Sequence, residues 1–127
     1  MNHQVKIGAS VAAGGGLGTL ARAVVTQVAV DNDVLTLWAV LFVNVVGALA
    51  LGWYAAHVRN SNRWSTLWVG FIAAGVLGSF TTFSAFSFEV VELFEAGDWL
   101  IGSAYAVVTV SVGLVAATIG RRFAEQR

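Results

Sequence analysis

Long apolar stretches, separated by short groups of charged residues, divide the chain into four segments. A helix needs about 20 apolar residues to cross the hydrocarbon core of a bilayer, which is about 30 Å thick. Each segment is long enough for this, so we predict an all-α membrane protein with four transmembrane helices in a single domain, residues 1–127. The predicted spans are about 5–30, 34–57, 64–95 and 98–121.

The basic residues predict the orientation of the chain. The links at 31–33, 57–63 and 96–98 are short, so four spans place both termini and the middle link on one side of the membrane. That side holds six of the seven basic residues: Lys6, Arg59, Arg63, Arg121, Arg122 and Arg127. Because loops rich in Lys and Arg stay in the cytoplasm, we expect a multi-pass protein of the plasma membrane with cytoplasmic termini. A cleavable signal peptide explains the first segment poorly, because Arg22 and the apolar residues after it do not form a short apolar region followed by a cleavage site.

Composition narrows the function classes. Hydrophobic residues make up 57% of the chain and charged residues only 11%, whereas soluble domains carry about 25% charged residues. Seven basic and seven acidic residues balance, so nothing in the net charge attracts nucleic acid. The chain has no Cys and no recognisable catalytic or nucleotide-binding constellation. We therefore expect neither an enzyme nor a nucleic-acid-binding protein.

Polar residues inside the first two spans are candidates for function. Gly14 and Gly18 lie one turn apart, a spacing typical of close helix packing. Arg22 is either an anchor that reaches the interface or a charge that attracts anions, because an intramembrane charge needs a partner or water. Asn44, near the middle of the second span, either hydrogen-bonds a neighbouring helix or donates its amide N–H groups to a passing anion.

The third segment carries the strongest signal. Residues 78–88 combine a glycine with closely spaced hydroxyl residues, a composition that weakens a helix locally, and the segment is longer than one straight crossing requires. We expect a break at mid-membrane, with its joint over Gly78 to Thr81, because ion-binding transporters and channels use such joints. Phe83 and Phe86 then share one helix face, as do Ser84 and Ser87. The alternative is an unbroken helix whose hydroxyls bond to their own carbonyls.

Hydroxyl residues also occur in the fourth span. Tyr105 and Thr109 lie one turn apart, and Ser111 follows. Taken alone, this pattern favours ordinary helix packing over a solute path.

Three motifs point to one family. They are Gly-x-x-Gly-Thr-x-x-Arg ending at Arg22, Phe-Val-Asn-x-x-Gly around Asn44, and Gly-x-x-Thr-Thr-Phe-Ser-x-Phe-Ser-x-Glu ending at Glu89. The chain resembles the Fluc/CrcB fluoride channels over essentially its whole length. The resemblance implies four-helix subunits in an antiparallel dimer with two fluoride pores, a central sodium ion, and passive efflux of cytoplasmic fluoride that protects the cell from fluoride toxicity.

The resemblance also assigns roles to residues. The fluoride pathway would comprise Asn44, Phe83, Ser84, Phe86, Tyr105 and Ser111. Main-chain carbonyls of Gly78 and Thr81 would coordinate sodium, Arg22 would lie in a vestibule, and Glu89 would close the motif without an assigned role. Ala85 departs from the pattern, because many relatives carry Thr there.

Elementary chemistry is compatible with fluoride transport. Aromatic rings have a positive edge that can contact a partly dehydrated anion, and a membrane potential of 100 mV drives a monovalent anion outward by about 2.3 kcal/mol. A small multidrug-type proton-coupled exporter is the leading alternative, but it would need a carboxylate deep in an early span, and the first two spans contain none. A non-conducting partner subunit of a heterodimeric channel is the third possibility.

The charge bias bears on the dimer. An antiparallel homodimer requires one sequence to insert in both orientations, which is easiest when basic residues are balanced across the membrane. Six basic residues on one side, against Arg22 at most on the other, favour a single orientation. We therefore expect an oppositely oriented paralogue as the partner, with a dual-topology homodimer as the alternative.

Overall fold

Four helical stretches follow the four predicted segments. In the computed structural model, which describes residues 2–27, 29, 33–61 and 63–126, every regular element is helical. The elements are α1 (His3–Gln27), α2 (Asp33–Arg59), α3 (Thr66–Val69), η1 (Gly70–Leu77), α4 (Gly78–Phe80), α5 (Phe83–Glu95) and α6 (Trp99–Glu125). The predictions of four helices and of a broken third helix are therefore confirmed. The expected end of the first span at residue 30, the link residue Asp31 and the basic Arg127 lie outside the described residues.

Three of the stretches are long and apolar enough to cross a membrane, judged by length and composition alone. They are Leu35–Arg59, Thr66–Glu95 and Trp99–Glu125. Among the described residues, α1 is not one of these candidates, although its 25 residues would extend for about 37 Å at 1.5 Å per residue. A multi-pass membrane protein is thus supported, and the first span stays a prediction.

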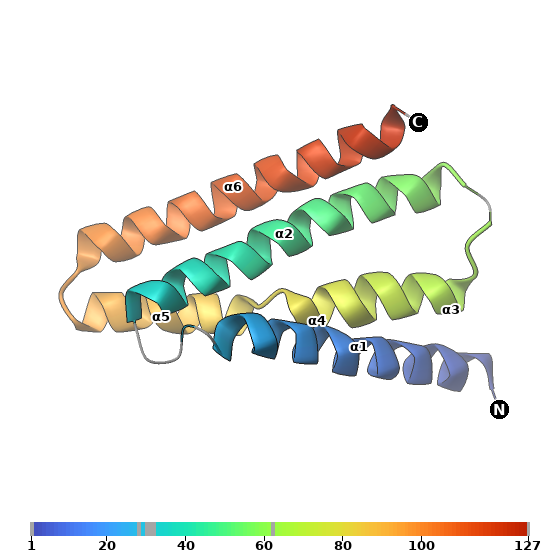
Figure 1. Ribbon diagram of the computed structural model, residues 1–127, viewed down its shortest axis with the longest axis horizontal. Helices are drawn as coiled ribbons and strands as arrows, with labels where there is room; N and C mark the ends of the chain where they lie inside the picture. Colours follow the sequence, from blue (N-terminus) through green and yellow to red (C-terminus); the bar gives the residue numbers. More distant parts are fainter. Residues whose placement is uncertain (1, 28, 30–32, 62, 127) are drawn as a thin grey trace.

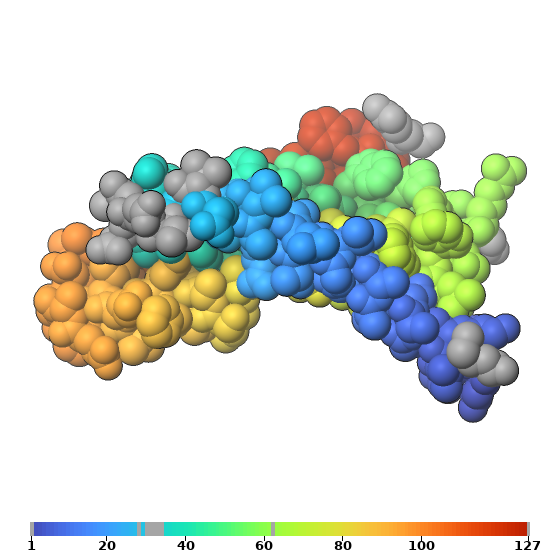
Figure 2. Space-filling model, turned by 60° about the horizontal axis from the view of Figure 1, so that its bottom comes forward, coloured from blue at the N-terminus to red at the C-terminus, as the bar shows by residue number. Residues whose placement is uncertain are grey.

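The third stretch changes its packing partner at the break. Before the break, η1 and α4 pack against α1, whereas beyond it α5 packs against α6 and α2. The α2 and α6 helices pair along the other side of the molecule (Figure 1), and the α1 helix covers one face of the stretch that precedes the break (Figure 2). The break therefore lies where the two helix pairs meet.

Glycines allow α1 and the third stretch to touch backbone to backbone. A methyl group added at Gly14 would collide with the carbonyl of Phe71, and one added at Gly18 would collide with the carbonyl of Val76. A methyl group at Gly75 on the facing η1 would lie 2.8 Å from the carbonyl oxygen of Val11 on α1, which is also too close. The predicted packing role of the Gly14 and Gly18 pair is confirmed.

This contact predicts a large difference between neighbouring glycines. Gly18→Ala should lower the free energy of unfolding in detergent by about 1–3 kcal/mol, and the melting temperature with it, because the atom that the new methyl group meets belongs to rigid backbone. Gly16→Ala is the matched control, since a methyl group there has no atom within 4 Å and alanine favours a helix. Equal melting temperatures for the two variants would contradict the packing seen here.

A second glycine sets the sharp reversal between α5 and α6. Gly97 has a φ of 85°, a left-handed conformation that glycine adopts without a Cβ penalty. Its N–H donates to the carbonyl of Phe94 at 3.1 Å, and the N–H of Asp98 donates to the carbonyl of Leu93 at 2.9 Å. These two bonds form a Schellman motif, which ends α5 and lets α6 begin at Trp99.

Few side chains form an interior. Val40 and Val43 are the largest fully buried side chains among the described residues. Large apolar residues stay exposed on every long helix, for example Leu20, Trp38 and Leu114. A soluble monomer rarely exposes so much apolar surface, so these faces fit contact with lipid or with another subunit.

Candidate functional site

The break in the third helix is held open by Asn44. Thr81 and Thr82 have extended backbone conformations, with ψ values of 157° and 119°. The Nδ2 group of Asn44 donates to the carbonyl of Thr82 at 3.0 Å, and the N–H of Thr82 donates to Oδ1 of Asn44 at 2.8 Å. One side chain on α2 thus accepts from the N–H of Thr82, which a continuous helix would direct to the carbonyl of Gly78, and adds a donor to the carbonyl of Thr82.

Thr82 also begins the second half-helix. Its hydroxyl accepts a hydrogen bond from the N–H of Ala85 at 3.2 Å, which makes it the N-cap of α5. The same hydroxyl lies 3.2 Å from the hydroxyl of Ser84. Threonine is a favoured residue at this position because its oxygen satisfies a free N–H group of the first turn.

These bonds release two particular carbonyl groups. In a continuous helix the carbonyl of Gly78 would accept from the N–H of Thr82, and that of Thr81 from the N–H of Ala85. Both N–H groups instead donate to side chains. Within the described residues, the carbonyl of Gly78 retains only a long contact of 3.4 Å from the hydroxyl of Thr81. Two backbone oxygens near the break are consequently available to other partners.

The position of the joint differs from the expectation. Gly78 lies inside a helix, with φ −65° and ψ −30°, and the extended residues are Thr81 and Thr82 rather than the stretch from Gly78 to Thr81. The physical reason is that the hydrogen bonds of Asn44 and of the Thr82 hydroxyl act at Thr82 and after it. A methyl group at Gly78 would meet only the carbonyl of Ala73, at 3.4 Å, so backbone freedom is not what this glycine provides.

Aromatic rings line one side of the break. The rings of Phe83 and Phe86 have centroids 5.8 Å apart, and the ring of Phe86 lies 5.7 Å from that of Tyr105. Phe83 is 80% exposed, whereas Phe86 and Tyr105 are half-buried. The structure therefore brings three of the predicted pathway residues into one row, and the first of them projects out of the single chain.

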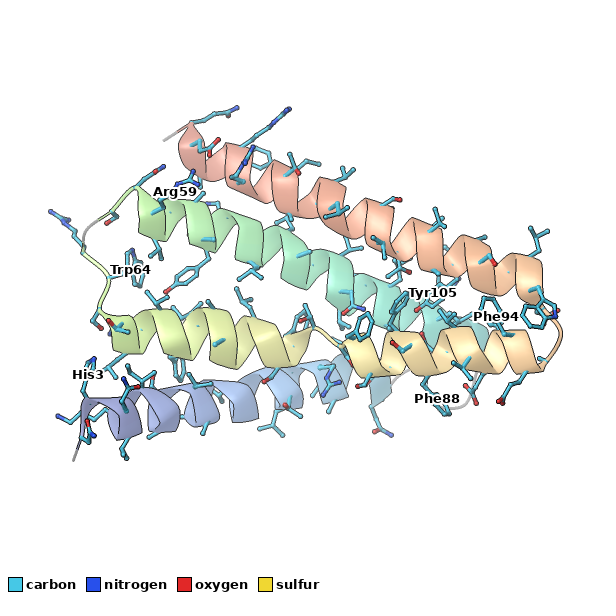
Figure 3. The ribbon with its side chains drawn as sticks, turned by 180° about the vertical axis from the view of Figure 1, so that it is seen from behind. His3, Arg59, Trp64, Phe88, Phe94 and Tyr105 are labelled. Atoms are coloured by element: carbon cyan, nitrogen blue, oxygen red, sulfur yellow. The ribbon has the colours of Figure 1, made fainter. Side chains whose placement is uncertain are left out.

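A buried carboxylate ends this row. The hydroxyl of Tyr105 donates to Oε2 of Glu89 at 2.5 Å, which links α6 to α5 (Figure 3 labels Tyr105). Glu89 is only 6% exposed, and within the described residues its other oxygen, Oε1, has no hydrogen-bond partner. The hydroxyl of Thr109, one turn beyond Tyr105, is also buried without a partner there.

A cavity of about 370 Å³ connects this carboxylate with Arg22. Side chains from α1, α2 and α5 line it, including Arg22, Thr26, Thr82, Ala85 and Glu89. Arg22 is half-buried and makes no ion pair with any residue that the structure describes. Of the two interpretations of Arg22, the attraction of an anion agrees with its position beside a cavity that is mostly apolar but carries polar groups such as Thr26, Thr82 and Glu89.

Ser111 lies farther along α6. It is exposed, and no hydrogen bond joins it to the other predicted pathway residues in the described part of the chain. In this single chain Asn44 hydrogen-bonds the neighbouring third helix, which is the first of the two interpretations given for it above. One of its two amide N–H groups remains free of that bond.

Sequence reasoning missed two participants. Thr82 received no role, although a Thr immediately before a helical stretch is a recognisable N-cap signal. The Tyr105–Glu89 hydrogen bond joins residues 16 positions apart on different helices, and no local pattern indicates it.

Comparison with known proteins places the chain in a family. The family model described as "CrcB-like protein, Camphor Resistance (CrcB)" matches residues 9–121. The chain belongs to the CrcB family. The matched region of this CrcB protein contains the whole site, from Arg22 to Ser111.

Curated relatives of this CrcB protein carry a functional name. The "Fluoride-specific ion channel FluC" of Hyphomonas neptunium is 42% identical over 115 residues, which cover 87% of this chain and 88% of the relative. The "Fluoride-specific ion channel FluC 1" of Mycobacterium bovis is 35% identical over 115 residues, covering 91% and 87%. The "Fluoride-specific ion channel FluC 2" of Symbiobacterium thermophilum is 38% identical over 120 residues, covering 91% and 95%.

Proposed function

We propose that the chain is a subunit of a fluoride-selective channel that lets cytoplasmic fluoride leave the cell passively and so protects the cell from fluoride toxicity. The observation that carries this proposal is the family match over residues 9–121, with relatives named as fluoride-specific channels. The broken helix and the aromatic row support it, because the rings of Phe83 and Phe86 directly follow the break. The protein belongs in the plasma membrane, with both termini in the cytoplasm.

The fluoride pathway runs past the break. Phe83 and Phe86 offer ring edges to a partly dehydrated anion, while Asn44, Ser84 and Ser111 supply hydrogen-bond donors. Tyr105 contributes its ring to the pathway, since its hydroxyl donates to Glu89. The donors are individually weak, which allows fluoride to enter and also to leave. The exposure of Phe83 in a single chain fits a path completed by a second subunit.

A sodium ion fits the carbonyl groups released at the break. Hard cations prefer oxygen ligands, and the carbonyls of Gly78 and Thr81 are among those that the break leaves without helical donors. These two carbonyls would hold the ion, at the centre of the dimer. The ion would supply a fixed positive charge that favours anions nearby. The proposal assigns Thr81 its main-chain oxygen, while its hydroxyl donates to the carbonyl of Leu77 at 3.1 Å.

The alternatives meet specific difficulties. A multidrug-type proton-coupled exporter would need a carboxylate deep in an early span, whereas the buried Glu89 lies on α5 and bonds to Tyr105. A non-conducting subunit would not need a row of rings beside a helix break. Both alternatives predict no fluoride current through the chain.

Fluoride efflux from liposomes tests the function. Proteoliposomes loaded with fluoride and containing the purified chain together with its paralogue should release fluoride once a potassium ionophore sets the potential, and should retain chloride. An electrode that reads fluoride makes the measurement, with protein-free liposomes as the control. Efflux by the chain together with its paralogue, and not by the chain alone, would identify a heterodimeric channel. Failure of both preparations would contradict a conducting role.

Topology provides the test of the dimer. We propose an antiparallel dimer with an oppositely oriented paralogue, since six basic residues lie on the expected cytoplasmic side. Because the chain has no native cysteine, single cysteines at Asn2 and Ala96 can be labelled from outside intact cells. A fixed orientation predicts labelling at Ala96→Cys only. Comparable labelling at both positions, with efflux by the chain alone, would establish a dual-topology homodimer instead.

A further inference from the structure

A second cavity, which has no part in the proposed fluoride path, opens between the C-terminal ends of α2 and α6. Its volume is about 300 Å³. Small residues form its floor, among them Gly52, Ala55 and Ala117, and Leu114 lies at its inner end. Arg59 and Arg121 line it at the ends of the two helices, and Figure 3 labels Arg59 there. The cavity therefore has an apolar interior and a cationic mouth.

The length of this cavity, called the groove below, matches the part of a bilayer leaflet next to the headgroups. Gly52 precedes Arg59 by two turns of α2, a distance of about 10 Å at 1.5 Å per residue. The hydroxyl of Thr118 is already bonded to the carbonyl of Leu114 at 2.8 Å, so this wall offers little to a polar ligand. Both helices are candidate membrane spans, which puts the apolar end of the groove on the side of the acyl chains.

The charges at the mouth are only partly neutralised. Oε1 of Glu125 accepts a hydrogen bond from Arg59 at 2.9 Å and lies 3.7 Å from Nε of Arg121. Two guanidinium groups thus share one carboxylate. Each guanidinium has five N–H donors, and the side chains of Arg59 and Arg121 are 64% and 54% exposed. Most of these donors are accessible to a further anion.

We propose that this groove binds an anionic phospholipid. The phosphate lies between Arg59 and Arg121, which Glu125 holds side by side, and one acyl chain lies over the small residues toward Leu114. Basic pockets between transmembrane helices suit lipid phosphates, and the apolar floor suits a lipid better than free phosphate. The proposal does not depend on which ion the protein transports.

Native mass spectrometry of the full chain in detergent tests this site with phosphatidylglycerol, phosphatidylcholine and inorganic phosphate as probes. Each arginine should contribute about fivefold to the apparent affinity, the equivalent of ~1 kcal/mol. Phosphatidylglycerol should therefore bind about 25-fold more tightly than phosphatidylcholine. Inorganic phosphate at the same concentration should not displace it.

Variants distinguish the contribution of the two arginines to lipid binding from that of the apolar groove. The double variant Arg59→Ala and Arg121→Ala should lose the preference for phosphatidylglycerol. Arg122→Ala is the matched control, since it removes a charge from the same turn of α6 outside the cavity lining. Glu125→Gln should raise the affinity for phosphatidylglycerol, a gain that misfolding cannot produce. Ala55→Phe should weaken lipid binding by filling the groove, with both arginines retained.

Any of the following results would overturn the proposal. The first is equal binding of phosphatidylglycerol and phosphatidylcholine by the wild type, as expected if another subunit covers the groove. The second is an equal loss in Arg122→Ala and in the double variant, which would indicate a diffuse charge effect. The third is unchanged lipid binding in Ala55→Phe, or displacement of the lipid by inorganic phosphate, which would indicate a site for phosphate alone.

Discussion

Replacing Phe83 or Phe86 with isoleucine should reduce fluoride flux about two- to twelvefold per ring, the equivalent of ~0.5–1.5 kcal/mol. Isoleucine keeps apolar bulk but removes the positive ring edge, and contacts of such edges between aromatic rings are worth about 0.5–1.5 kcal/mol. Phe83 is 80% exposed, so loss of its ring should weaken the contact with fluoride and leave the folded state unaffected. Electrode recording of fluoride release from liposomes measures the effect.

A phenylalanine far from the break provides the control. Phe123→Ile changes an equally apolar residue, 60% exposed, near the end of α6, and should leave flux unchanged. Phe86→Ile also removes the ring contact with Tyr105 at 5.7 Å, so its melting temperature must be compared with that of the wild type. Undiminished flux in both the Phe83 and the Phe86 variants would refute a pathway based on ring edges.

Asn44→Ala should abolish fluoride flux and destabilise the protein by about 1–3 kcal/mol. The variant leaves the N–H of Thr82 without its partner and removes one donor from its carbonyl, which as the N-cap carbonyl still accepts from the first turn of α5, and an unsatisfied buried group costs about 1–3 kcal/mol. Hydrogen bonds between side chains in membranes average only about 0.6 kcal/mol, but Thr82 is 6% exposed, so little solvent reaches its N–H to replace Asn44. Thermal unfolding in detergent, followed by flux measurement, tests both effects.

Two further variants sharpen this result. Asn44→Asp keeps an acceptor for the N–H of Thr82 but cannot donate to its carbonyl, so it isolates the second hydrogen bond. Asn60→Ala is the control, because Asn60 is exposed just after α2 and, within the described part of the chain, it bonds only through its backbone N–H, to the carbonyl of Ala56. If Asn44→Ala retained wild-type stability and flux, Asn44 would not be what holds the break open.

The local pattern of the chain predicts its helices well, and the structure explains why. Charged and turn-forming residues interrupt apolar stretches, so each helix ends where the sequence changes, as at Gly97 between α5 and α6. The Gly14 and Gly18 pair likewise identifies its own packing face, because residues four apart lie on one side of a helix. Neither inference requires knowledge of the neighbouring helix.

The local sequence predicts that the third helix breaks but not at which residue. Hydroxyl residues after Gly78 indicate a weak helix, but a weak helix can open at any of several peptide bonds. Asn44, 38 residues away, selects Thr82 because α2 brings its amide to that peptide group. Also unpredicted was the π-helical stretch η1, which faces the close glycine contacts of α1.

The sequence by itself determined that this is a helical membrane protein with an interrupted third helix, because apolar length, charge position and hydroxyl content are properties of short stretches. Only the tertiary structure decided the contacts between stretches. It pairs Asn44 with the backbone of Thr82, Tyr105 with Glu89, and Arg59 and Arg121 with Glu125. Such contacts depend on the relative position and rotation of two helices, which backbone approach at glycines sets and no single helix encodes.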